Sequence, residues 1–524
     1  MKYFSKIGNI KSRAVTVEAD LTRGLCTPRY REKNSATGLL NFSSAVYPWL
    51  KNRERFRYLN YALDFSRGVG MHNDKLIYAV GNKFYYGADE KFEVSEGKKQ
   101  FCVFNGRILI FPDMLYFNPE TDEHGRFGFT TGEITYTIAH RTTAGVDCGL
   151  SGINSEDIDL TQYFKVGDGI KITDEQGLGI SGFHTIIGIV RQLKGLVFEK
   201  FEFGDGESYT LTGKLSHGSP ETCDAACISG GRVWVAGDNK IYASTLGDEC
   251  NWAVAGDDEK SSFVCNLGGG EKINACIDLE GNPVFFSENK IYKIYGDRAS
   301  NFYLKCCANW GGVSRSMRDT VAVVRDKIFY VSPHGLTCFD GSTPRVLERT
   351  PFEATDVVTA ASDGKRYYAV VAEAAGNRLY VYDETYAQWH DYGKYDFQSF
   401  FTYEGALCAA TASGVTVLSG SFPLMDTQAY LTENILELSA SFELDTDGAS
   451  PVELSVDAES IGSSGHDIYV SWDGGARKFL GRISGTFSGV KVIPLIPRAC
   501  QGIEVFIEGR GTLTLRKISV KCVG

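Results

Sequence analysis

"GRVWVAGDNKIYASTLGD" (residues 231–248) and "GNPVFFSENKIYKIYGD" (residues 281–297) carry nearly the same pattern of residues. In both stretches, two short runs rich in Val, Ile, Phe and Tyr flank a polar turn that contains Asn. Apolar residues that recur at every second position are typical of a half-buried β-strand, and Gly, Asn and Asp between two such runs indicate a β-hairpin. Each stretch is therefore predicted to form one hairpin.

This hairpin pattern occurs seven times along the chain. The copies begin at Asp74, Gly106, Gly231, Gly281, Asp326, Lys365 and Gly405, so successive starts are 32, 125, 50, 45, 39 and 40 residues apart. Such spacings are typical of the four-stranded blades of a β-propeller. Repeated hairpins that stack around a ring also remove exposed sheet edges. We predict an all-β chain with a β-propeller of about six or seven blades; a string of unrelated hairpins in one long sandwich is the alternative.

The one large spacing, 125 residues, indicates an insertion between two blades. Residues 131–215 lack the blade pattern and read as strands of a separate small β-barrel or sandwich. Without them the spacing returns to 40 residues. We therefore predict an N-terminal extended arm and first strands (1–64), a first part of the propeller (65–130), the inserted small β domain (131–215) and a second part of the propeller (216–425).

The last hundred residues follow a different pattern. From residue 426 to residue 524, apolar and polar residues alternate, and turns recur about every 8 to 12 positions. This pattern is typical of a β-sandwich of roughly 100 residues. We predict a C-terminal β-sandwich as a further domain.

Composition and charge exclude several classes of protein. The chain has 524 residues, 43% hydrophobic content and a formal net charge of −11. A protein that follows a nucleic-acid backbone needs a concentrated basic surface, which this balance does not favour. No apolar run is long enough for a signal peptide or a membrane span. The 14 scattered cysteines are expected to be small buried side chains in a reducing compartment.

Motifs of catalysis and metal binding are absent from the sequence. There is no G-x-S-x-G, H-E-x-x-H, Walker or G-x-G-x-x-G motif, and "CDAAC" (residues 223–227) and the adjacent Cys306 and Cys307 lack a matching partner pair. We predict no catalytic residues, no cofactor and no metal, and a chain that is not an enzyme.

A resemblance adds to this pattern. The opening "ADLTRGLCTPRYREKNSATGLLNFSSAVYPWLKNRERFRYL", followed by "RVWVAGDNKIYASTLGDECNW" and "SENKIYKIYGDRASNFYL", resembles the propeller-type nozzle, or stabilization, proteins of short-tailed bacteriophages. In that family the turn carried here by Ser244, Leu246, Gly247, Asp248 and Trp252 closes a blade. The high cysteine count and the C-terminal sandwich depart from the family pattern.

The resemblance implies a structural role in a virion. We expect part of the conduit for DNA ejection in a phage tail, assembled in the cytoplasm of the bacterial host. The implied partners are further copies of the chain in a ring, with sixfold symmetry, together with adaptor or portal-side proteins and distal tail or fibre proteins. Phage DNA would pass without being bound specifically.

The N-terminal arm is the predicted contact between copies. Its candidate interface residues combine exposed-looking apolar side chains with a basic cluster: Leu39, Leu40, Phe42, Trp49, Arg53, Arg55 and Arg57. These arginines could meet the acidic surface of the next copy. Burial of the arm against its own propeller, as an ordinary N-terminal strand, is the alternative.

Another class of function stays open. Propellers serve as enzymes and as scaffolds, so the fold alone assigns no function. "SWDGGARKF" (residues 471–479) resembles the Asp-box turn of sialidase-like propellers, although it occurs once and within the predicted sandwich. The alternative is therefore a glycan-binding or glycan-cleaving propeller, such as a tail-borne adhesin. A cellular propeller scaffold is weaker, because the WD and kelch signatures are missing.

Overall fold

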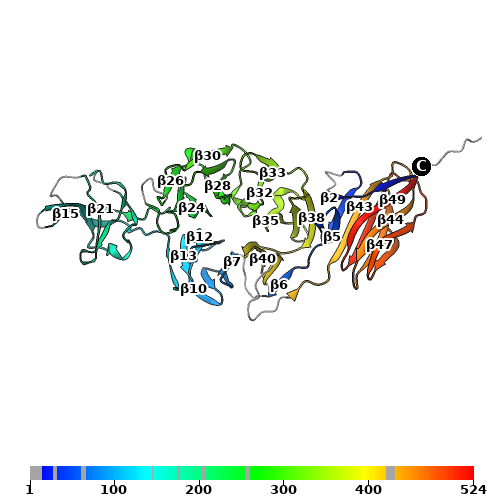
Figure 1. The fold of residues 1–524 in the computed structure, drawn as a ribbon, viewed down its shortest axis with the longest axis horizontal. Coiled ribbons are helices and arrows are strands. Elements are labelled where there is room, and N and C mark those ends of the chain that lie inside the picture. Colours follow the sequence, from blue (N-terminus) through cyan, green and yellow to red (C-terminus); the bar gives the residue numbers. More distant parts are fainter. Residues whose placement is uncertain are drawn as a thin grey trace, which may run out of the picture.

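The chain is built almost entirely of β-strands, and this part of the prediction is confirmed. The computed structural model describes residues 14–26, 32–60, 67–143, 146–173, 178–202, 208–253, 260–412, 414–420 and 431–524. Within them, three bodies lie in a row: an inserted body at one end, a body of seven sheets in the middle and a terminal body at the other end (Figure 1). None of the helices in these residues is long and apolar enough to cross a membrane.

The middle body consists of seven antiparallel units, which we call its sheets: five are separate four-stranded sheets, the sixth is a four-stranded part of a larger sheet, and the seventh has five strands. In chain order, the first three are β7 (Val69–His72), β8 (Lys75–Val80), β9 (Lys83–Tyr86) and β10 (Asp89–Glu93); β11 (Gln100–Phe104), β12 (Arg107–Phe111), β13 (Leu115–Asn118) and β14 (Glu123–Arg126); and β23 (Ala225–Ser229), β24 (Arg232–Gly237), β25 (Lys240–Ala243) and β26 (Phe263–Asn266).

The next three sheets follow without interruption. They are β27 (Ile273–Leu279), β28 (Asn282–Ser287), β29 (Ile291–Tyr295) and β30 (Tyr303–Ala308); β31 (Ala322–Val324), β32 (Lys327–Ser332), β33 (Gly335–Phe339) and β34 (Pro344–Val346); and β35 (Val357–Ser362), β36 (Arg366–Val371), β37 (Arg378–Asp383) and β38 (Gln388–Lys394). Short 3-10 helices, η4 (Gly268–Gly270), η5 (Arg315–Thr320) and η6 (Ala354–Asp356), precede their first strands.

The seventh sheet contains a strand from the start of the chain. Its own hairpins supply β39 (Ser399–Tyr403), β40 (Ala406–Thr411) and β41 (Gly414–Ser419), and β6 (Arg57–Asn60) pairs with β41 in antiparallel register, followed by β42 (Leu431–Thr432). Leu59 of β6 packs in one core with residues of β7 and β8 from the first sheet. The arm thus joins the last sheet to the first.

The first strands of the seven sheets surround a common space. We call β7, β11, β23, β27, β31, β35 and β39 the first strands. Each contacts the first strand of the next sheet, and β39 contacts β7. All seven contribute side chains to one cavity. Apolar clusters between neighbouring sheets hold this arrangement together, since the alternating side chains of each sheet face those of the next.

Local turn chemistry explains the hairpins. Between β24 and β25, Asp238 and Asn239 adopt φ values of 52° and 58°, the left-handed conformation that a two-residue hairpin turn requires. Asn tolerates this conformation because its short side chain can bond locally. The strand that precedes this turn, β24, is buried along its whole length.

The inserted body lies between the second and third sheets. It comprises β15 (Ile134–Thr143), β16 (Val146–Asn154), β17 (Gly169–Ile172), β18 (Gly182–Thr185), β19 (Gly188–Val190), β20 (Gly195–Glu199), β21 (Ser208–Gly213) and β22 (Leu215–Ser216), with η2 (Leu160–Gln162) and η3 (Arg191–Leu193). Its two sheets share one apolar core that contains no residue of the seven-sheet body.

The terminal body combines both ends of the chain. It contains β1 (Ala14–Glu18), β3 (Ser35–Leu40), β4 (Phe42–Val46), β5 (Trp49–Asn52), β43 (Glu437–Asp445), β44 (Ser450–Ser460), β45 (Gly465–Trp472), β46 (Lys478–Ser484), β47 (Phe487–Pro494), β48 (Gly502–Arg510) and β49 (Thr514–Val523). Two sheets bury their facing sides in one core. β2 (Asp20–Leu25) and β3 connect β38 to β43, so one hydrogen-bonded sheet of ten strands runs through both bodies.

Replacing Leu59 by Ala tests the role of β6. Leu59 is 3% exposed, so its truncation should lower the free energy of unfolding by about 2–5 kcal/mol, through lost burial and a residual cavity. Leu431 in the paired strand β42 is 46% exposed, and Leu431→Ala should cost less than about 0.5 kcal/mol. Urea unfolding measures both, and equal losses would contradict the closing role of β6.

His390 of β38 should make stability depend on pH. Burial lowers its pKa from 6.5 to about 4, and neither ring nitrogen has a hydrogen-bond partner among the described residues. Between pH 6.5 and 4 the His390 ring is protonated in the unfolded state but not in the folded state. The free energy of unfolding should therefore fall as pH drops from 6.5 to 4, by at most about 1.4 kcal/mol per pH unit. His390→Phe should flatten this slope, whereas His124→Phe at an exposed position should not.

Candidate functional site

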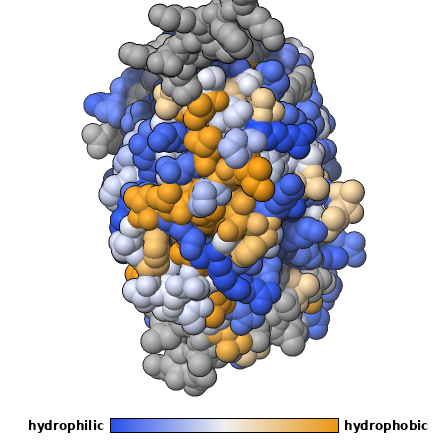
Figure 2. Space-filling view, turned by 90° about the vertical axis from the view of Figure 1, so that its right-hand side faces the viewer, coloured by the Kyte–Doolittle hydropathy of each residue, from blue (hydrophilic) through white to orange (hydrophobic). Residues whose placement is uncertain are grey.

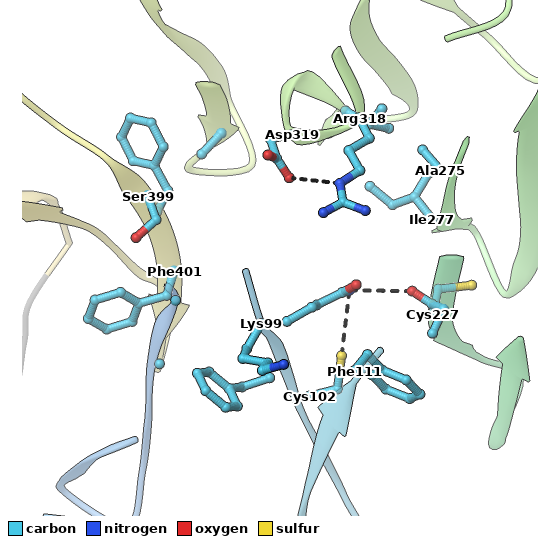
Figure 3. Close-up of a pocket in the computed structure, with 18 of the residues that line it drawn as sticks. Lys99, Cys102, Phe111, Cys227, Ala275, Ile277, Arg318, Asp319, Ser399 and Phe401 are labelled. Carbon is cyan, nitrogen blue, oxygen red and sulfur yellow. Dashed lines mark hydrogen bonds and ion pairs between the residues drawn. The ribbon is translucent and has the colours of Figure 1, made fainter. Parts of the chain in front are cut away.

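The cavity enclosed by the first strands is the candidate site. Its volume is about 780 Å³, within the range of small-molecule sites. Figure 3 shows side chains from several sheets pointing toward its middle, among them Ile277, Cys102 and Arg318. The walls are mainly apolar, and charged side chains gather where the first strands begin.

Three contacts show that four of the first strands, β11, β23, β27 and β31, begin at the same end of the cavity. Lys98, just before β11, forms an ion pair with Asp319, just before β31, at 2.8 Å between Nζ and Oδ2. Arg315 of η5 reaches Asp224, just before β23, at 3.3 Å. At the other ends of β23 and β27, Ser229 donates a hydrogen bond to Asp278. The residues that precede these strands therefore lie at one end of the cavity, and the residues at the far ends of the strands lie at the other.

The ion pair between Lys98 and Asp319 spans the charged end of the cavity. Lys98 precedes the first strand of the second sheet and Asp319 that of the fifth, so their bond joins sheets that are not neighbours. Both side chains are about one third exposed. A partly exposed ion pair contributes little to stability, so these charges remain available for a ligand.

Lys99 is not one of the partly exposed charged side chains at this end of the cavity. Its ammonium group is 1% exposed and lies 3.0 Å from Oδ1 of Asp113. It also donates to Ser95 Oγ at 2.8 Å. A buried, fully paired lysine of this kind positions its loop and leaves no donor for a ligand.

Cysteines from three sheets line the cavity wall. Desolvation raises the pKa of Cys102 and of Cys223 to about 12, and it raises that of Cys276 well above its usual value. Thiols with such pKa values stay protonated at neutral pH and are poor nucleophiles and metal ligands. The residues that the structure describes contain no group of three or more His, Cys, Asp or Glu side chains suited to a metal ion. All 14 cysteines are free.

The predicted interface residues lie elsewhere. Leu39 and Phe42 are buried in the core of the terminal body, and Leu40 is half-buried near Gly393. Trp49 is 43% exposed, and the guanidinium of Arg516 lies 5.6 Å from its ring centre.

The basic cluster of the arm is also bound within the chain. Arg53 is buried, donates to Asn41 Oδ1 at 2.8 Å and forms an ion pair with Glu433 at 2.8 Å. Arg55 donates to the Glu433 carbonyl and Arg57 to the Gly420 carbonyl. Leu39, Phe42 and Arg53 are thus not surface residues, because the arm packs on its own chain. A contact between copies remains a prediction for Leu40, Trp49, Arg55 and Arg57.

Sequence reasoning missed the charged end of the cavity. Lys98, Asp224, Arg318 and Asp319 each stand one to four residues before a first strand. A charged residue shortly before the first strand of several sheets is the signal in the sequence, and it does not reveal which of these residues meet across the cavity.

No protein-family model and no curated protein matches the chain. Among solved structures, the chain is similar to an exo-β-1,3-galactanase from Phanerochaete chrysosporium (TM-score 0.21, 10% identity, 56% of this chain and 95% of that one). It is similar to a family 43 arabinoxylan arabinofuranohydrolase from Bacillus subtilis (TM-score 0.17, 10% identity, 56% and 94%). It is also similar to an acylaminoacyl peptidase from Pyrococcus horikoshii (TM-score 0.25, 11% identity, 75% and 59%).

These comparisons correct one prediction. The sequence led us to expect a chain that is not an enzyme, whereas the similar structures include glycoside hydrolases. The statement that the chain has no enzymatic activity is therefore withdrawn. With each TM-score well below 0.5, the likeness assigns no activity in its place.

Proposed function

We propose that the seven sheets are the blades of a β-propeller, with the cavity on its axis. The contact between β39 and β7 and the completion of the seventh sheet by β6 support this architecture. The inserted body is then a small β domain between blades two and three, and the terminal body a β-sandwich. In this arrangement the charged connections before the first strands form one mouth of the axial cavity.

The same geometry leads us to propose that the axial cavity binds a carbohydrate. The carrying observation is the combination of a cavity of about 780 Å³ with charged groups at one end and partly apolar walls. Phe101, Phe400 and Phe401 contribute to its walls, with rings that pack into the cores between sheets. The charged groups Asp224, Arg318 and Asp319 supply donors and acceptors for hydroxyl groups.

Cleavage of the bound glycan would need two carboxyl groups at the same place. Hydrolysis of a glycosidic bond uses one as acid and the other as base or nucleophile. Asp224 and Asp319 are the two carboxylates at the charged end, and each is paired with a cation at 3.3 Å or less. They are the candidates for these roles, so product release is assayed together with binding.

Filling the cavity should abolish binding. Ile277 points into the cavity (Figure 3), so Ile277→Trp should reduce affinity for any oligosaccharide found on a glycan array by tenfold or more. Val264→Trp is the matched control, because Val264 is 42% exposed on the outer strand β26. Titration calorimetry measures the affinity of both variants for the oligosaccharide. Unchanged affinity in a folded Ile277→Trp protein would place binding outside the cavity, and an array without any binder would contradict the proposal.

A structural role in a phage tail is the second candidate. It is favoured by an apolar face on the outer end of the terminal body, which Figure 2 shows. Val490 and Val492 of the edge strand β47 and the following Ile496 are more than half exposed there. Apolar surface of this kind marks contacts between proteins. We propose that neighbouring tail proteins, or other copies in a sixfold ring, cover it.

Imaging of virions labelled on this chain tests the structural role. Six copies around the tail axis are expected, and Val492→Glu should reduce incorporation into tails, because a carboxylate in the contact would be buried without a partner. Glu453→Gln, on the neighbouring strand, is the control. A single copy per particle, or absence of the label from virions, would overturn this candidate.

A further inference from the structure

Arg318 is the charged side chain of the cavity that lacks a close partner. It belongs to η5, whose end leads into β31, and Figure 3 shows its guanidinium pointing into the open middle of the cavity. Its one ion pair among the described residues is with Asp319, at 3.9 Å between Nε and Oδ1. This distance is too long for a hydrogen bond. The N–H groups of Arg318 are therefore available to a ligand.

The neighbouring carboxylates are already neutralised by other cations. Asp319 accepts a hydrogen bond from Lys98 at 2.8 Å through its other oxygen, Oδ2. Asp224 is paired with Arg315 at 3.3 Å. Lys98 is thus bound to Asp319 and Arg315 to Asp224, which leaves Arg318 as the cation at this end without a carboxylate at hydrogen-bond distance among the described residues.

The surroundings of the guanidinium strengthen its attraction for an anion. Figure 3 places Ala275 and Ile277 beside the side chain of Arg318. These side chains offer no charge and no strong acceptor. An ionic contact beside apolar walls is stronger than one in open water, because the local dielectric is lower.

We infer that the cavity takes a saccharide with an anionic group and that Arg318 binds this group. The inference rests on the proposed carbohydrate function and specifies its ligand class. The planar guanidinium matches a carboxylate or a sulfate with two parallel hydrogen bonds, a geometry that no hydroxyl group provides. An acidic saccharide would thus be selected over a neutral one of the same shape.

The decisive comparison uses oligosaccharides that differ only in charge. Galacturonic acid oligomers, galactose oligomers of the same length and sulfated galactose oligomers are titrated into the full chain at low salt. The uronate should bind about 10- to 100-fold more tightly than the neutral oligomer, with a difference that shrinks as salt rises. Preference for the sulfated oligomer instead would identify sulfate as the anionic group.

Substitutions of Arg318 test whether this residue causes the preference for the acidic oligomer. Arg318→Gln should lower the affinity for the acidic oligomer to about that for the neutral oligomer, whereas Arg318→Lys should keep a part of the preference. Arg315→Gln is the matched control, because Arg315 belongs to the same helix but its side chain is 63% exposed. A preference that survives in Arg318→Gln would overturn the inference.

The outcomes separate this inference from the proposed function. If neutral and acidic oligomers bind equally, the carbohydrate function stands and the role of Arg318 fails. If none binds, the carbohydrate function fails, and inorganic sulfate tests Arg318 alone. Sulfate should then raise the melting temperature of wild type and Arg315→Gln more than that of Arg318→Gln. Equal shifts in all three proteins would overturn the anion site.

Discussion

The pairing of β6 with β41 is the interaction on which the middle body depends. It joins residues 57–60 to residues 414–417 in antiparallel register, and the side chain of Leu59 packs with the first and seventh sheets together. Without β6, β41 would present an unpaired strand edge, which is costly and prone to wrong pairing. This pairing completes the contact between the seventh and the first sheet, and the contacts between successive first strands continue it around the cavity.

Arg53 couples that closure to the terminal body. The chain passes from β5 to β6 beside the segment that leads back from β42 to β43, and Arg53 bonds Glu433 across these two passages. Burial alone would raise the pKa of Glu433, but the hydrogen bond and charge of Arg53, together with hydrogen bonds from Tyr395 and the Phe56 N–H, lower it. A buried pair is strongly destabilising when one partner is removed. The two connections therefore behave as one stiff link, reinforced by the bond from Ser44 to Asp383 at 2.5 Å.

The sequence predicted what local chemistry determines. The turn at Asp238 and Asn239 and the alternation along residues 231–248 could be read directly, since both depend on residues a few positions apart. The site could not be read in this way. Lys98 and Asp319 are 221 residues apart, and only the closed arrangement of sheets brings them together. The arm residues show the same limit, because the run around Leu39 and Phe42 looks exposed until β43 and β49 cover it.

The shared terminal body has a consequence for how the chain is made. A ribosome releases β1 to β5 first, yet β1 pairs with β49 and β3 with β43, which are synthesised last. Domains generally fold as units during synthesis, the N-terminal ones first. Here β4 pairs with β5 at once and β2 reaches β38 before the final domain emerges, but β1 and β3 must wait for β49 and β43. Until then the apolar side chains of these strands stay exposed, and the yield in a cell should depend on the chaperones that protect nascent chains.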